Sequence, residues 1–68
     1  MTSTHTVEIK AGTPARASEV ADALKKKGYQ DAPDAEQRVE VVGGNVVKVT
    51  ASGPTEKEAK IKALMDTN

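Results

Sequence analysis

The chain has no cysteine, phenylalanine or tryptophan, and its 68 residues include one tyrosine. Without cysteine there is no disulfide framework, no thiolate nucleophile and no cysteine-bound zinc. Without Phe and Trp there is little material for the aromatic platform on which RNA-binding sheets stack bases. These absences exclude several common kinds of site and are compatible with the cytoplasmic location that we expect.

The chain also lacks a net charge and long apolar runs. Ten Lys and Arg residues balance ten Asp and Glu residues, which removes the long-range field that drives nonspecific binding to nucleic acid or anionic lipid. No segment approaches the roughly 20 apolar residues of a membrane span, and the N-terminus has no basic lead. We expect one small soluble domain over residues 1–68, without a membrane partner and near the lower size limit for a stable core.

A valine-rich segment that reverses at Gly43-Gly44-Asn45 predicts a β-hairpin. Val and Thr favour strands, while Gly and Asn tolerate the positive φ of a tight turn. Residues directly opposite each other share a face, and only a three-residue loop closing on Val42 and Val46 keeps the valines together. The predicted inward pairs are Val41 with Val47 and Val39 with Val49, and the predicted outward pair is Glu40 with Lys48.

The segment before the hairpin predicts a strand followed by a helix. Residues 5–11 alternate with period two, which is typical of a half-buried strand. Thr13 and Pro14 are the cap and first residue that a helix favours. We expect this helix to end before Gly28 in a Schellman motif, with Tyr29 covering Leu24. Its inward positions share helical spacing: Ala17, Val20, Ala21 and Leu24.

After a surface loop over residues 30–37 and the hairpin, the chain predicts a second helix. The run Thr55-Glu-Lys-Glu58 matches a capping box, which marks a helix start. We expect a core-facing stripe of large apolar residues on this helix, with two alanines on its flank. The stripe is Ile61, Leu64 and Met65, and the flank is Ala59 and Ala63.

The order strand, helix, strand, strand, helix predicts an α+β fold. A right-handed crossover places the second strand parallel to the first with the third between them, giving the sheet order 2-3-1. Both helices then cover one face in a two-layer open-faced sandwich. This β-α-β-β-α plan is ferredoxin-like without its last strand, so the first strand has one unpaired edge.

No combination of residues predicts catalysis. The one histidine, His5, stands near the N-terminus without an orienting partner, so we expect a non-enzymatic protein without a cofactor. The acidic residues Asp31, Asp34 and Glu36 lack the glycine of a calcium loop, and we expect no metal site. The segment Gly12-Thr13-Pro14 carries no phosphate-binding motif.

Two surfaces remain as candidates for binding. An unpaired strand edge is a template for another chain, which favours a protein partner or a homodimer at Thr6, Glu8 and Lys10. The alternative is a nucleic-acid or anion-binding patch made of lysines alone, with a strong dependence on salt. This patch would contain Lys25, Lys26, Lys27, Lys57 and Lys60, with Lys62 beside them.

Three known kinds of domain share parts of this outline. The run from Val7 through the helix to Thr50 resembles a heavy-metal-associated domain, but residues 12–16 lack that family's GMxCxxC loop, so copper handling is not implied. The segment 46–65 is similar to the last third of a KH domain, although no GxxG clamp precedes it. The same segment equally resembles the small bacterial BON and ring-building modules, which implies a function in association.

Overall fold

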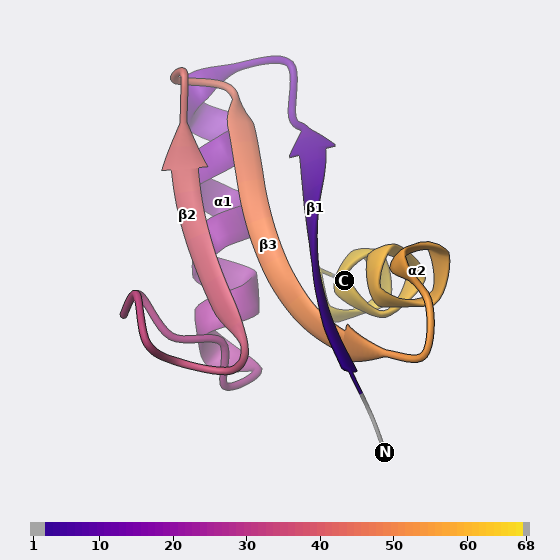
Figure 1. Ribbon diagram of the computed structural model, residues 1–68. Coiled ribbons are helices and arrows are strands. Elements are labelled where there is room, and N and C mark those ends of the chain that lie inside the picture. The colour runs from indigo at the N-terminus through magenta and orange to yellow at the C-terminus, as the bar shows by residue number, and fades with distance from the viewer. Residues whose placement is uncertain (1–2, 68) are drawn as a thin grey trace.

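The computed structural model describes residues 3–67 and has the expected small α+β fold. Three strands form one antiparallel sheet with the order β1-β3-β2 (Figure 1). The elements are β1 (Ser3–Lys10), α1 (Pro14–Lys26), β2 (Arg38–Val42), β3 (Val46–Gly53) and α2 (Glu56–Asp66). The first strand begins two residues before the predicted segment 5–11 and ends one residue earlier. The predicted sheet order 2-3-1 is confirmed.

The register predicted for the hairpin is confirmed. Val41 pairs with Val47 and Glu40 pairs with Lys48, and the hairpin closes on the pair of residues 42 and 46. Gly43 and Gly44 have positive φ values of 62° and 80°, which a side chain would disfavour. The left-handed conformation of the turn is therefore carried by glycine.

Both ends of α1 follow the sequence signals. The Thr13 hydroxyl accepts a hydrogen bond from the Arg16 N–H at 3.1 Å, and Pro14 occupies the first turn. At the other end, the N–H of Tyr29 donates to the Leu24 carbonyl at 3.1 Å, which completes a Schellman motif with Gly28 at φ 106°. The motif buries Tyr29 against the end of the helix.

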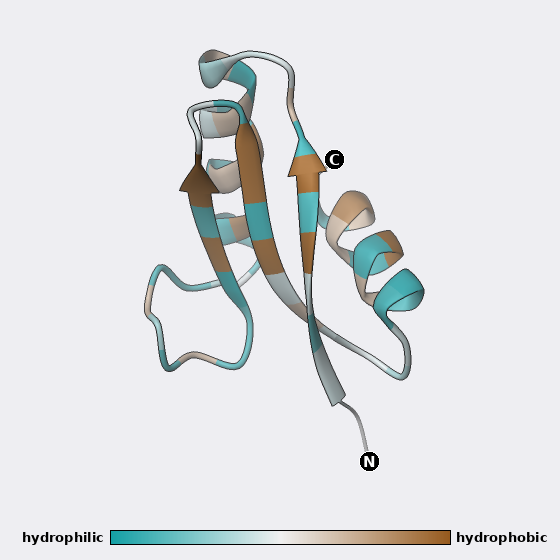
Figure 2. Ribbon diagram, turned by 45° about the horizontal axis from the view of Figure 1, so that its top comes forward, coloured by the Kyte–Doolittle hydropathy of each residue, from teal (hydrophilic) through white to brown (hydrophobic). Residues whose placement is uncertain are grey.

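The two helices pack on the same face of the sheet. α1 packs against β2 and β3, and α2 packs against β3 and β1. Apolar bands alternate with polar ones along the strands in Figure 2, as expected for a sheet with one covered face. The predicted core residues that are buried are Val7, Ile9, Val20, Leu24, Tyr29, Val39, Val47 and Val49.

The predicted core face of α2 is wrong. Ile61, Leu64 and Met65 are 47%, 41% and 69% exposed, whereas Ala59 and Ala63 are fully buried. Two positions along a helix correspond to a rotation of about 200°, so a helix that turns Ala59 and Ala63 to the sheet must turn Ile61 away from it. The large residues form an exposed apolar stripe instead.

Val41 is also more exposed than predicted, at 44%. It pairs with the buried Val47 but lies in an edge strand, close to the hairpin end where α1 begins (Figure 1). The inward face of the hairpin is therefore only partly buried.

Candidate interaction surface at the edge of β1

The backbone of β1 alternates between the sheet and solvent. The Ala11 N–H donates to the Asn45 carbonyl of the adjoining hairpin at 2.9 Å, and the β1–β3 register continues from there without a bulge. In an antiparallel ladder the hydrogen-bonding groups of successive residues point to opposite sides. The odd-numbered residues of β1 therefore bond β3, and the even-numbered residues present their N–H and C=O groups at the outer edge.

The outward positions include all three residues predicted for this surface. Thr6, Glu8 and Lys10 are exposed, and their side chains lie on the sheet face opposite the helices. Among residues 3–67, no hydrogen bond reaches the outward backbone groups of these residues. The structure thus brings the predicted side chains and a row of free backbone groups to one edge.

The side chains of this edge belong to a charge pattern that crosses the sheet. Glu8 lies opposite Lys48 of β3, and Lys48 lies opposite Glu40 of β2. Next to this row, the Thr6 and Thr50 hydroxyl oxygens are 3.0 Å apart. The charges therefore alternate in sign across the sheet and end with a carboxylate at β1.

The opposite edge of the sheet is covered by the loop over residues 30–37. The Val39 N–H donates to the Gln30 carbonyl at 3.1 Å, and the Gln30 N–H donates to the Gln37 carbonyl at 2.9 Å. An isolated parallel bridge joins Gln30 to Arg38. This loop provides hydrogen-bond partners for some of the outward backbone groups of β2. The edge of β1 is therefore the longer of the two edges without such partners.

The helix α2 lies near one end of this open edge. Gly53 pairs with Ser3, and the chain enters α2 three residues after Gly53. At about 3.3 Å per residue, the Lys10 end of β1 is roughly 23 Å from Ser3. Figure 1 likewise shows α2 beside the first half of β1, whereas on the outer side of the half that ends at Lys10 this view shows no other element. The Glu8–Lys10 half is the accessible part of the edge.

The predicted lysines are spread from the C-terminal end of α1 along the length of α2. Lys26 and Lys27 line a groove with Glu19, Asp22 and Asp66, and the charge of Lys27 acts on Asp66 at the C-terminal end of α2. Lys57 is nine residues before Asp66, about 14 Å along the helix axis. Lys25 and Lys60 are exposed on the two helices. Carboxylates therefore lie among these lysines, and the nucleic-acid alternative stays a prediction.

A polar cluster that the sequence did not predict joins the two helices. The Tyr29 hydroxyl donates to Asp66 Oδ2 at 2.8 Å, and Lys62 Nζ donates to the same oxygen at 3.1 Å. Lys62 Nζ also lies 3.2 Å from the Tyr29 hydroxyl. The spacing of Lys62 and Asp66 suggests a pair on one helix, but Tyr29 comes from a distant part of the chain.

The contacts within this cluster change the pKa values of its three side chains. Burial, followed by the hydrogen bond to Asp66, raises the pKa of Tyr29. Partial burial alone would raise the pKa of Asp66. Hydrogen bonds from Tyr29 and Lys62, together with nearby positive charge, outweigh this effect and lower the pKa of the carboxyl. Burial alone would lower the pKa of Lys62, but the hydrogen bonds of Lys62 to Asp66 and Tyr29 outweigh this effect and raise its pKa. The cluster favours the charged Lys62–Asp66 pair and a neutral Tyr29.

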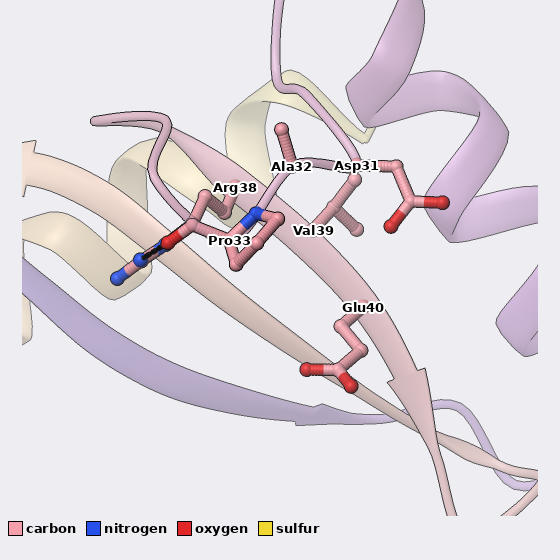
Figure 3. Close-up of a pocket in the computed structure, with 6 residues that line it drawn as sticks. All are labelled: Asp31, Ala32, Pro33, Arg38, Val39 and Glu40. Carbon is pink, nitrogen blue, oxygen red and sulfur yellow. Dashed lines mark hydrogen bonds between the residues drawn. The ribbon is translucent and has the colours of Figure 1, made fainter.

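The sheet carries two shallow cavities beside the loop over residues 30–37. Asp31, Pro33, Arg38 and Glu40 contribute to the larger one, of about 300 Å³ (Figure 3). The Arg38 guanidinium donates to the Pro33 carbonyl, which fixes the loop on the sheet. Within residues 3–67 there is no group of three His, Asp or Glu side chains that could hold a metal ion. The cavity mixes both signs of charge and contains no evident nucleophile with a base.

His5 lies on the side of β1 that faces the helices. It is half-buried, and its Nε2 atom is buried without a hydrogen-bond partner in the described part of the chain. A general base must be within hydrogen-bond reach of the group that it activates. Within residues 3–67, no group lies within hydrogen-bond reach of His5 Nε2.

The fold and this surface define a small α+β domain with one partly covered and one open sheet edge. No protein family, curated protein or solved structure matches the chain. None of the helices within residues 3–67 has the length and apolar character needed to cross a membrane.

Proposed function

We propose that this chain is a non-enzymatic interaction domain that binds an extended segment of a protein partner, or of itself, along the outer edge of β1. The observation that carries the proposal is the row of outward backbone groups at Thr6, Glu8 and Lys10. Strand addition uses such groups for affinity, while neighbouring side chains select the partner. The bound segment would extend the sheet next to β1.

We also propose that the fold is a ferredoxin-like plan without its last strand. In the full plan a fourth strand pairs with the outer edge of the first, which is the edge left open in this chain. A bound segment would take the place of that strand. The cysteine-free composition is compatible with the cytoplasmic location, which stays a prediction.

The proposal can be tested with two substitutions at Glu8. Glu8→Pro removes the outward N–H, while the bonds to β3 come from the odd-numbered neighbours and are retained. Glu8→Thr removes the same charge but keeps the N–H. We expect Glu8→Pro to lose the protein captured by the wild-type chain and Glu8→Thr to retain clearly more of it, as measured by quantitative affinity capture.

Circular dichroism and thermal unfolding should show that both variants are folded before they are compared. Equal capture by the two folded variants would contradict the proposal, because binding would then not use the outward N–H. An equal loss in both would also contradict it, because the carboxylate rather than the outward N–H would then account for the binding.

A further inference from the structure

We infer that the open edge of β1 pairs with a second copy of this chain, antiparallel about a two-fold axis at Ile9, so that Glu8 of each copy lies opposite Lys10 of the other. This inference rests on the proposed function, since it names the partner of the same edge. Its basis is the self-complementarity of the edge in backbone, charge and apolar contacts.

The backbone restricts where a two-fold axis can lie. Outward groups occur at even-numbered residues, and an antiparallel pair forms hydrogen bonds only where outward groups of both strands meet. Even-numbered residues must therefore lie opposite even-numbered residues, which places the axis at a residue. In and next to the accessible half of the edge the axis can pass at Val7, Glu8, Ile9 or Lys10, and an axis at Lys10 would place two lysines directly opposite each other.

The charges select among these positions. An axis at Glu8 places two glutamates directly opposite each other, which is unfavourable. An axis at Val7 places Glu8 opposite a threonine. An axis at Ile9 forms two Glu8–Lys10 pairs between the copies and extends the alternating row of Glu40, Lys48 and Glu8 by one lysine. This arrangement matches every charge of the edge.

The face toward the helices agrees with the same axis. Ile9 meets its own copy at the axis, and Val7 lies opposite Ala11, so the contacts on this face are apolar. The paired segment, residues 7–11, is also the part of the edge distant from the start of α2. An interface of two five-residue strand segments is small and typical of transient complexes, so we expect a dimer that dissociates on dilution.

Charge reversal tests the axis directly. In sedimentation velocity over a concentration series, Glu8→Lys or Lys10→Glu alone should weaken self-association about tenfold or more, because two attractive pairs become repulsive. The double variant E8K/K10E restores both pairs and should recover association. A mixture of the two single variants should form heterodimers for the same reason.

Glu40→Lys is the matched control, because it makes the same change of charge on the same face of the sheet. Glu40 lies in β2, away from the outer edge of β1. It should leave self-association unchanged. Circular dichroism should verify each fold, since Glu8→Lys also places a lysine opposite Lys48. Two-dimensional NMR should locate the wild-type contacts at residues 7–11.

A wild-type chain that remains monomeric at millimolar concentration would overturn the inference. So would a dimer that the single reversals leave intact or that the double reversal fails to restore. If the chain is monomeric but Glu8→Pro still abolishes capture of another protein, the inference fails and the proposed function stands. If neither self-association nor capture depends on the edge, both fail.

Discussion

At the scale of single residues, small side chains set the distance between α2 and the sheet. Ala51, Ala59 and Ala63 are fully buried, and Gly53 at the end of β3 is buried beside them. A Cβ atom on Gly53 would lie 3.0 Å from the Ala59 backbone nitrogen and 3.3 Å from its Cα. The helix therefore packs its backbone close to the strand, and a side chain at position 53 would crowd the backbone of α2.

We predict that Gly53→Ala lowers the free energy of unfolding by about 1–3 kcal/mol, the usual range for overpacking a core. The added methyl group meets backbone atoms of α2 that cannot rotate away, so the helix must shift. Chemical denaturation checks the value. Unchanged stability would mean that α2 does not pack as closely as this geometry requires.

The same small residues explain where the prediction of the core failed. Ranking residues by size favours Ile61, Leu64 and Met65 for burial, and this ranking succeeds for Leu24 on α1. On α2, close packing through alanine replaces packing through large side chains. Nothing in the local sequence distinguishes the two modes, because the deciding partner, Gly53, belongs to another element.

At the scale of elements, the C-terminal ends of α1 and α2 are joined by Tyr29, Lys62 and Asp66. A carboxylate in the last turn of a helix opposes the helix dipole. Asp66 offsets this with hydrogen bonds from Tyr29 at 2.8 Å and Lys62 at 3.1 Å. The cluster therefore fixes the second helix to the end of the first.

This cluster predicts a pH-dependent contribution to stability. The pKa of Asp66 is lowered in the folded state, so its contribution is present above the ordinary value of 3.8 and is lost as the pH falls through the folded pKa. Asp66→Asn should cost about 1 kcal/mol at pH 7, as expected for a partly exposed hydrogen-bonded charge. The difference from wild type should disappear near pH 2.

Urea denaturation from pH 2 to pH 7 measures this dependence, with Asp34→Asn in the exposed loop as the control. The control should follow the wild-type profile. A constant difference between Asp66→Asn and wild type across the range would show that the carboxylate charge does not contribute.

Most element-level features could be predicted because they depend on neighbours in sequence. The caps at Thr13 and Thr55 follow from local hydrogen bonds, and the hairpin register follows from parity around Gly43 and Gly44. The contact between Tyr29 and Asp66 joins residues 37 positions apart. Such a contact depends on how the helices pack, which local patterns do not encode.

At the scale of the whole molecule, the two edges of the sheet differ. Gln30 and the loop around it cover part of the β2 edge, while the edge of β1 keeps its outward groups free of hydrogen bonds within residues 3–67. Period-two alternation was enough to predict Thr6, Glu8 and Lys10 together on one face. The covering of the other edge could not be predicted, because a loop without periodicity gives no sign of its path.

The most direct test of the open edge is amide hydrogen exchange resolved by residue, followed as the concentration of the chain is raised. In dilute solution the amides of Glu8 and Lys10 should exchange rapidly, while those of Val7 and Ile9 are protected by β3. On association the amides of Glu8 and Lys10 should become protected. Slow exchange at Glu8 and Lys10 in the dilute monomer, or fast exchange at both in the associated state, would contradict the account.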